Sequence, residues 1–456
     1  MKKNEGKILF NYLKTRISLI EDKIINFINI NNSLKAEGFI QKIIERNIIY
    51  LNDDLRVQYF YTILLNMNNY NNYNNYDQYS RRISIDRFKA SNFKDKYNEN
   101  KIPDIHLNET IFGQLLNILG DLSGKKFFRD KGQKLFEVNL KGERAIDAGG
   151  PYHEILSDIC DDLQSNYIEL FIKTPNNKEN IGELRDRYII NPNANNNKYR
   201  KAFQFIGKLM ILAISSGETF NLNFHPIIWK GLLDNKITFK EYETIDINVY
   251  NIIENLQKGL SKKDKDFIES FDLNFIIKNC GEKDIELIEN GQNIKVTLEN
   301  AELYIELAQS KLIEELNNQI KFMRDGLFSG IGKNILQILN WVQLEKIVCG
   351  ESIFDIEDFK KHTQCDNNEK VIQWFWEWLR NCKEEDKFKY LKFVSGRSRL
   401  PKSDYKHVIH LIDENNKLPA SHTCFSTLDL PKYNSKKTLC EKMKYVIENI
   451  ANITDN

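Results

Sequence analysis

One short segment of the sequence combines residue types that could perform nucleophilic chemistry. It spans Leu418–Pro431 and reads Leu-Pro-Ala-Ser-His-Thr-Cys-Phe-Ser-Thr-Leu-Asp-Leu-Pro. The flanking prolines favour a loop or a strand edge around Cys424 rather than a helix. A partly exposed thiol with polar neighbours can ionise and act as a nucleophile, and His422 and Thr423 could donate hydrogen bonds there. Cys424 is therefore the candidate catalytic residue, with an ordinary surface cysteine as the alternative.

A cysteine hydrolase would need a histidine base beside this thiol. His407 and His410 lie just upstream on an expected strand, and either could approach Cys424. The sequence around the cysteine is not papain-like, however, and strand histidines are more often plain surface residues. This alternative therefore stays open but is the weaker one.

Metal binding has little support in the sequence. Neither the seven cysteines nor the seven histidines show the paired spacing of a zinc site. Scattered free thiols fit a reducing compartment, and most of them are expected to be small buried hydrophobic residues. The glycines of 142–150 fit a tight turn better than a phosphate-binding loop, and Trp374–Trp378 fits a core better than a base-stacking platform.

The elements around the cysteine segment form a compact C-terminal unit. Val371–Leu379 has the periodicity of a helix, Tyr405–Ile412 alternates like a strand, Glu414–Lys417 is a turn, and Ser435 caps a last helix. Upstream, short strands alternate with helices, which predicts a mixed α+β unit. The expected strands are Arg82–Ile85, Phe136–Leu140 and Tyr167–Ile172, and the expected helices are Pro151–Leu163, Phe203–Ser216 and 301–325.

The N-terminal region differs from the rest of the chain. Apolar residues at spacings of three and four predict an amphipathic helix over 7–30, and Leu55–Leu65 is a second apolar, helical stretch. Asn68–Tyr76 then repeats Asn-Asn-Tyr, a low-complexity linker that cannot build a core.

Composition excludes several classes of function. The 456 residues carry 65 basic and 64 acidic side chains, and this balance argues against a nucleic-acid-binding protein. The longest apolar run, Leu209–Ile214, is far shorter than a membrane span, and the first residues do not form a signal peptide. A soluble protein of the cytoplasm or nucleus is expected.

Several motifs together resemble the HECT-type ubiquitin ligases, and their order and spacing are those of that family. The resemblance covers about residues 81–456, and the residues of its motifs are most similar to those of the large HERC branch. The motifs are Leu418–Pro431, Ile83–Arg87, Ile111–Leu115, Lys141–Glu143, Ile146–Pro151, Thr174–Asn176, Phe203–Lys208, Glu289–Thr297, Cys349–Gly350, Asp358–Thr363, Trp374–Trp376 and Phe393–Pro401.

The resemblance implies a role for each matching residue. Cys424 would accept ubiquitin from a ubiquitin-conjugating enzyme as a thioester and pass it to a substrate lysine. His422 and Thr423 would position the thioester, and Asp429 would be an acidic group near the attacking lysine. The conjugating enzyme would dock on the helix Asn248–Gln257 through Val249, Ile252, Ile253 and Leu256. No metal, nucleotide or organic cofactor is expected.

The implied fold is α+β and bilobal, with a large, mostly helical N-terminal lobe and a small α+β catalytic lobe. The expected divisions are a helical segment 1–67, a linker 68–80, an N-terminal lobe 81–363 with a docking subdomain at about 226–296, a hinge 364–370 and a catalytic lobe 371–456.

Two departures leave a second function open. Many family members have a phenylalanine four residues from the C-terminus that supports ligation, and Ile453 stands there instead. Large HERC relatives carry long repeat arrays before the ligase domain, whereas about 80 residues precede it here, so the chain could be a fragment. The alternative to an active ligase is an idle scaffold that binds a conjugating enzyme or ubiquitin.

Overall fold

The computed structural model describes residues 56–64, 81–104, 106–143, 150–194, 197–350, 353–366, 369–397, 399–400 and 405–449. The predicted helix 7–30, the linker 68–80 and Ile453 lie outside these residues. The chain divides into two compact units. One consists of residues 1–78 and 332–343, and the other of residues 79–331 and 344–456.

The first unit contains a helix over residues 56–64, which confirms the helical prediction for that stretch. Phe60 is fully buried, and Leu64 is 3% exposed. Arg56 donates from Nε and Nη2 to the carbonyl of Ile338, at 3.0 and 2.9 Å. These bonds connect the helix to the segment after α13 (Lys333–Leu336).

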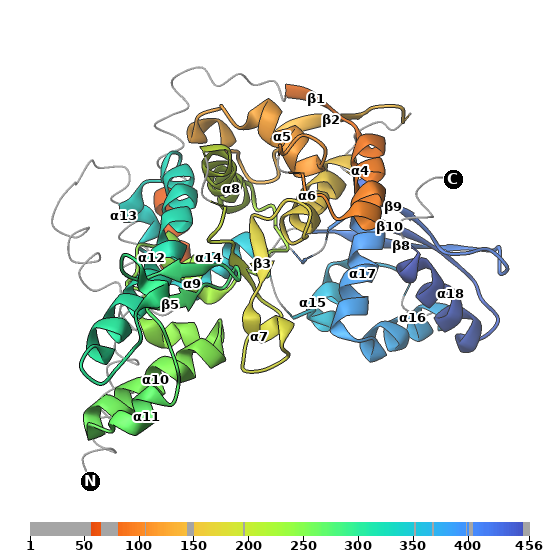
Figure 1. Ribbon diagram of the computed structural model, residues 1–456. Helices are drawn as coiled ribbons and strands as arrows, with labels where there is room; N and C mark the ends of the chain where they lie inside the picture. Colours follow the sequence, from red (N-terminus) through yellow and green to blue (C-terminus); the bar gives the residue numbers. More distant parts are fainter. Residues whose placement is uncertain are drawn as a thin grey trace, which may run out of the picture. The chain divides into compact units, whose positions relative to one another are not determined.

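The second unit begins with an N-terminal lobe, which we define as the described residues 81–331 and 344–350 (Figure 1). Its strands form three pairs: β1 with β2 in parallel, and β3 with β4 and β5 with β6 antiparallel. The strands are β1 (Arg81–Ile85), β2 (Phe136–Leu140), β3 (Phe171–Lys173), β4 (Tyr188–Ile190), β5 (Ile276–Lys278) and β6 (Asp284–Glu286).

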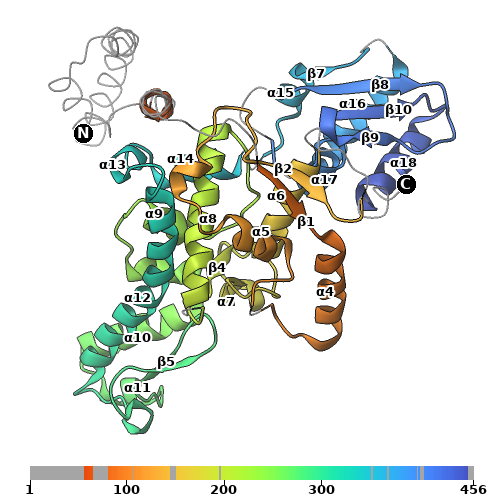
Figure 2. The same ribbon diagram turned by 90° about the horizontal axis from the view of Figure 1, so that it is seen from above.

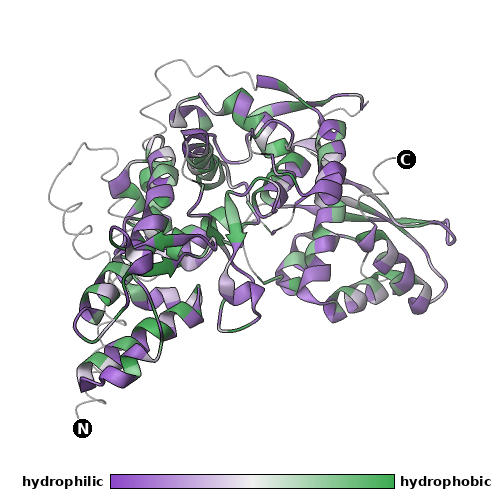
Figure 3. Ribbon diagram, viewed as in Figure 1, coloured by the Kyte–Doolittle hydropathy of each residue, from purple (hydrophilic) through white to green (hydrophobic). Residues whose placement is uncertain are grey.

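Helices supply most of this lobe. The longest pair, α8 and α12, pack against each other, and Figure 3 shows apolar residues along α8 and β3. The helices are α4 (Arg87–Asn100), α5 (Ile111–Leu119), α6 (Gly150–Leu163), α7 (Pro175–Lys178), α8 (Asn197–Ser216), α9 (Pro226–Leu232), α10 (Ile247–Lys262), α11 (Lys265–Glu269), α12 (Ala301–Phe328) and α14 (Trp341–Cys349), with short 3-10 turns at η2 (Gly124–Phe127), η3 (Phe239–Thr244) and η4 (Gly291–Asn293).

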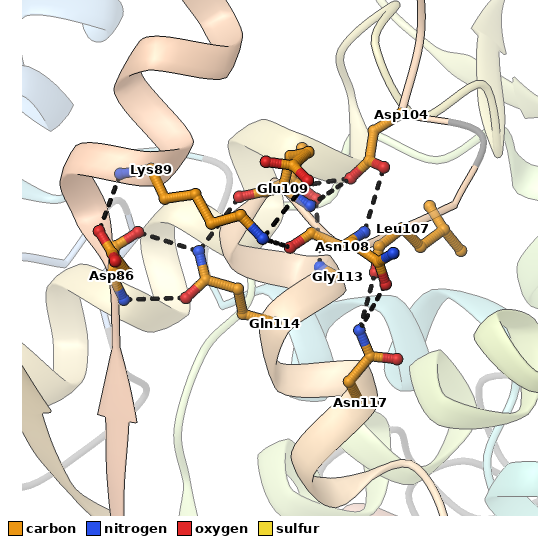
Figure 4. A network of polar contacts seen from close by, with 10 residues as sticks. Asp86, Lys89, Asp104, Leu107, Asn108, Glu109, Gly113, Gln114 and Asn117 are labelled. Carbon is orange, nitrogen blue, oxygen red and sulfur yellow. Dashed lines mark hydrogen bonds and ion pairs between the residues drawn. The ribbon is translucent and has the colours of Figure 1, made fainter.

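A polar network fixes the start of α4 against α5 (Figure 4). Asp86 caps α4 by accepting from Lys89 N at 2.8 Å. The Gln114 side chain on α5 accepts from Asp86 N and donates to Asp86 O, at 2.8 and 2.9 Å. Since backbone groups of one element are satisfied by a side chain of the other, the first turn of α4, and with it Arg87, is held in place.

The C-terminal lobe, which we define as the described residues from 353 to 449, has its own core. Buried residues from Phe354 to Ile447 form one hydrophobic cluster, in which Phe375, Trp376 and Trp378 lie. This confirms the core interpretation of the tryptophan segment. The helices are α15 (Ile356–Lys361), α16 (Lys370–Asn381), α17 (Glu384–Ser395) and α18 (Lys436–Glu448).

A mixed sheet in the order β7-β8-β10-β9 completes this lobe. β8 pairs in parallel with β7 and β10, and β9 pairs antiparallel with β10. Ser435 caps α18 by accepting from Thr438 N at 3.1 Å, as the sequence predicted. The strands are β7 (Thr363–Gln364), β8 (His407–Ile412), β9 (Ala420–His422) and β10 (Thr427–Pro431).

The division between the lobes differs from the predicted one. The expected hinge 364–370 starts on β7, which belongs to the C-terminal sheet and pairs with β8. Phe354 and Phe359 precede that hinge and yet lie in the C-terminal core. The C-terminal lobe therefore begins near residue 353 rather than 371, because these aromatic side chains are buried with it.

The described part of the chain contains no helix long and apolar enough to cross a membrane. The α+β architecture agrees with the fold expected from the sequence.

Candidate functional site

The backbone of Cys424 lies in a short turn between two strands. β9 ends at His422, the 3-10 turn η5 spans Thr423–Phe425, and β10 starts at Thr427. Ser426 closes the turn in the left-handed region, at φ 50° and ψ 46°, and its N–H donates to Thr423 O at 3.3 Å. A cysteine in a tight connection at a sheet edge, rather than inside a helix, is the arrangement that the prolines predicted.

The sheet aligns Asp429 with two histidines. Asp429 on β10 is opposite His410 on β8, and His422 on β9 is opposite Thr427, two residues away on the same face. His422 Nε2 lies 2.9 Å from Asp429 Oδ2, and His410 Nδ1 lies 3.6 Å from Oδ1. Both histidine side chains are more than half exposed. The predicted residues His422 and Asp429 therefore meet, and the carboxylate orients the imidazole next to the turn.

The N-terminal lobe provides one wall of the site. Thr423 Oγ1 donates to Glu154 Oε1 on α6 at 3.4 Å, and Glu154 Oε2 accepts from Arg87 Nη2 on α4 at 2.6 Å. Arg87 is also within 4 Å of Glu143 and Asp158. A guanidinium surrounded by carboxylates keeps Glu154 oriented toward the turn. Local sequence patterns missed Glu154 and Arg87, because they are more than 250 residues away from Thr423 in the chain.

Phe425 is the most exposed large apolar side chain of the described residues, at 71%. It directly follows Cys424 in the turn. The turn therefore offers an exposed aromatic side chain immediately after Cys424 in the chain.

A buried ion pair joins the two lobes close to this site. Arg397 Nη1, just after α17, lies 3.0 Å from Glu218 Oε2, and Arg397 Nη2 lies 2.6 Å from His153 Nε2 on α6. Burial raises the pKa of Glu218, but the Arg397 guanidinium beside it outweighs that effect, and the pKa is lowered to about 2. Burial and Arg397 lower the pKa of His153. The neutral His153 ring can then accept from the guanidinium.

Further bonds between the lobes surround this pair. Arg399 donates from Nε and Nη2 to the side-chain oxygens of Asn221 and Asn223, at 2.7 and 2.9 Å. Lys392 on α17 lies 3.0 Å from Asp161 on α6. The contacts define one arrangement of the lobes, in which the Cys424 turn faces α6.

The two histidines considered as bases behave differently. His410 is exposed and contacts Asp429. His407 is fully buried, and both of its ring nitrogens are occupied, Nε2 by Tyr390 Oη and Nδ1 by Ser426 O. His407 therefore has no ring nitrogen free to take a proton from a thiol, which weakens the hydrolase alternative.

The other cysteines are poor nucleophiles. Cys160, Cys280 and Cys349 are buried, and burial raises the pKa of each thiol, for the latter two to about 12. Burial also raises the pKa of Cys365, Cys382 and Cys440. The described residues contain no group of three side chains placed to hold a metal ion.

The predicted docking residues on α10 divide into two pairs. Val249 and Ile252 are partly exposed, whereas Ile253 and Leu256 are fully buried. The buried pair packs the helix onto the lobe, so it is not part of the surface that α10 presents. Phe267 on α11, which is 39% exposed, lies beside Gly259 of α10 and extends that surface.

Comparison with known proteins agrees with these observations. Residues 157–453 match the family model described as HECT-domain (ubiquitin-transferase). The chain is 28% identical over 351 residues to E3 ubiquitin-protein ligase HERC2 of Mus musculus, covering 74% of this chain and 7% of that protein. It is 30% identical over 333 residues to E3 ubiquitin-protein ligase pub1 of Schizosaccharomyces pombe, covering 69% and 42%.

The chain therefore spans less than half the length of these relatives. HERC2 is among them, as the resemblance to the large HERC branch predicted. Because the family model matches well over half of the residues, the chain belongs to the HECT-domain family of ubiquitin transferases.

Proposed function

We propose that this protein is a ubiquitin-protein ligase with Cys424 as its nucleophile. The observation that carries the proposal is the turn between β9 and β10, in which Cys424 directly follows His422, held by Asp429, and Thr423, held by Glu154 of α6. The raised pKa values of the six other cysteines support the choice. The family's name describes the same reaction class.

The reaction has two steps. The Cys424 thiolate attacks the thioester carbonyl of ubiquitin on the conjugating enzyme, and the enzyme's cysteine leaves as a thiolate. A substrate lysine amine then attacks the new thioester, loses a proton and forms an amide, while Cys424 leaves as a thiolate. Exchange of one thioester for another changes little in bond energy, so the protein contributes mainly position and orientation.

The neighbouring side chains have matching roles in the proposal. His422, oriented by Asp429, and Thr423, oriented by Glu154, immediately precede Cys424 and hold the thioester. Asp429 and Glu154 also provide negative charge that attracts a lysine ammonium and can accept its proton. Backbone N–H groups of the turn can stabilise the oxyanion.

The two steps require different partners, so the lobes must change their arrangement between them. α10, the proposed docking helix for the conjugating enzyme, lies far from the C-terminal sheet in both views (Figures 1 and 2). The described residues of the N-terminal lobe end at Gly350, whose φ of 78° makes it the natural pivot. Ubiquitin, a conjugating enzyme and a protein substrate are the proposed partners, in the cytoplasm or nucleus.

A non-reducing gel tests the proposal directly. The protein is incubated with ubiquitin, ATP, activating enzyme and a panel of conjugating enzymes. We expect a ubiquitin adduct that collapses with reductant and is lost in Cys424→Ala, while the matched control Cys365→Ser retains it. An adduct that persists in Cys424→Ala would refute the assignment.

The scaffold alternative predicts a different result in this assay. An idle binding module would form no adduct with any conjugating enzyme but would still bind one. A pull-down of the conjugating enzyme without a thioester would therefore favour the scaffold.

A further inference from the structure

A buried chain of hydrogen bonds connects the turn that contains Cys424 to strand β8 and helix α17. His407 on β8 and Tyr390 on α17 are both 0% exposed. Tyr390 Oη lies 2.7 Å from His407 Nε2, and His407 Nδ1 lies 2.5 Å from the carbonyl oxygen of Ser426. α17 is thereby connected through one imidazole to the residue that closes the turn.

The chemistry of the three groups fixes the direction of each bond. A carbonyl oxygen can only accept, so Nδ1 carries the proton and donates it to Ser426. In the neutral ring Nε2 is then the acceptor, and the Tyr390 hydroxyl donates to it. Burial lowers the pKa of His407 to about 4, so the ring is neutral near pH 7.

The ring has little freedom to move. Phe359 stacks on it at 5.2 Å between ring centroids, and Tyr390 meets it edge-on at 5.9 Å. The backbone N–H of His407 donates to His362 O at 3.0 Å. One face of the ring, its Nε2 edge and the backbone of His407 are therefore constrained, so its Nδ1–H has a fixed position.

Ser426 needs such support. A residue with a β-carbon in the left-handed region is strained by about 1–2 kcal/mol. Its carbonyl accepts from His407 Nδ1 and, at 3.1 Å, from the backbone N–H of Val408. These two bonds fix the peptide after Ser426, while its own N–H closes the turn on Thr423. The conformation of the backbone around Cys424 thus depends on the Ser426 carbonyl.

We propose that His407 is a positioning residue for the reaction at Cys424, acting through the Ser426 carbonyl. The inference rests on the proposed function for its catalytic consequence, although the hydrogen-bond chain itself does not. His407 touches no reacting atom: it keeps the turn in the conformation from which Cys424 can receive and release ubiquitin.

Four variants separate the two bonds of the ring. His407→Phe fills the space but removes both bonds. His407→Asn can place an amide N–H where Nδ1 was and so restores the bond to Ser426, whereas His407→Gln reaches toward Tyr390 and does not. Ile409→Val, at a residue 4% exposed on the same strand, is the matched control for lost stability without a change at Ser426.

Single-turnover charging of Cys424 by a ubiquitin-loaded conjugating enzyme is the first measurement. We expect His407→Phe and His407→Gln to lower the maximal rate about tenfold or more, since small misplacements at a reacting centre are costly. The conjugating-enzyme concentration at half-maximal rate should not change. His407→Asn should recover most of the rate, and Ile409→Val should keep it. Wild-type rates in His407→Phe, or an equal loss in His407→Asn and His407→Phe, would overturn the proposal.

Hydrogen exchange provides a readout independent of catalysis. The amide of Val408 and the amide of Ser426 should be protected in the native protein and in His407→Asn, and exchange faster in His407→Phe. Unchanged protection in His407→Phe would refute the positioning role. If the native protein shows this pattern yet never forms a thioester, the proposed function fails while the positioning of the turn stands.

Discussion

Arg397 of the C-terminal lobe and Glu218 of the N-terminal lobe form a salt bridge of 3.0 Å, in which the Glu218 side chain is only 7% exposed. The carboxylate stays ionised despite its burial because the guanidinium lies beside it, and the pKa of Glu218 falls to about 2. Arg397 also contacts His153 on α6, and the next residue of that helix, Glu154, contacts Thr423, so the salt bridge lies close to the turn of Cys424. The observed arrangement of the lobes therefore depends on a charge pair whose carboxylate is almost inaccessible to water.

Removal of one partner should be costly. In Arg397→Met, the buried Glu218 loses its counter-charge, and we expect the free energy of unfolding to fall by about 3–5 kcal/mol at pH 7. Glu218→Gln in the Arg397→Met background should recover a large part of the loss, because no charge is then left buried. Urea denaturation of the single and double variants measures the coupling. Additive losses would show that the pair does not act as a unit.

The docking face of α10 can be tested with two neighbouring residues. Ile252→Asp changes a partly exposed side chain and should weaken charging of Cys424 by a conjugating enzyme with little effect on stability. Ile253→Asp buries a carboxylate at a fully buried position and should unfold the subdomain instead. Thermal melts and charging assays on both variants separate the two effects. Full charging in Ile252→Asp would remove this face from the docking surface.

Acid should destabilise the N-terminal lobe through His225. Burial and the nearby Arg187 lower the pKa of His225 to about 3, from an ordinary value of 6.5. The folded state therefore keeps His225 neutral, while the unfolded chain takes up a proton as the pH falls below 6.5. Stability is complete above that pH and declines toward pH 3, by about 2 kcal/mol at pH 5.

His225→Asn isolates this contribution. His225 Nδ1 accepts from Ile227 N at the start of α9, and an asparagine side chain can make the same cap without titrating. Denaturation midpoints of both proteins from pH 8 to pH 4 provide the comparison. Parallel curves would contradict the assignment.

The cap of α18 has a modest and separate effect. Ser435→Ala removes the acceptor for Thr438 N and should lower stability by about 1 kcal/mol. Ser435→Asp should retain the cap and the stability. Differential scanning calorimetry of the three proteins is sufficient, and a Ser435→Ala protein as stable as the native one would show that water replaces the bond.

Local periodicity predicted most of the elements in the described residues. The expected helices at 151–163, 203–216, 301–325 and 371–379 all occur, because the spacing of their apolar residues records which face is buried. The strand expected at Tyr167–Ile172 is reduced to Phe171–Lys173. Tyr167 instead packs edge-on against Phe93 and Tyr97 of α4, a tertiary contact that no alternation of apolar residues indicates.

The site was predictable only where it is local in sequence. Residue types and the flanking prolines indicate Cys424, His422 and Thr423 as candidates within one segment, and the family resemblance adds Asp429. Glu154 comes from a distant helix and could not be inferred from it. On α10 the spacing of apolar residues predicts one apolar face. It does not indicate which residues of that face are buried in the lobe, as Ile253 and Leu256 are.

The sheet that supports Cys424 also has consequences for solubility. Its two outer strands, Thr363–Gln364 and Ala420–His422, have two and three residues, whereas the inner strands β8 and β10 have six and five. Long open edges invite pairing with strands of other molecules, and short ones limit it. The lobe can therefore keep the turn of Cys424 beside a sheet edge without offering a template for aggregation.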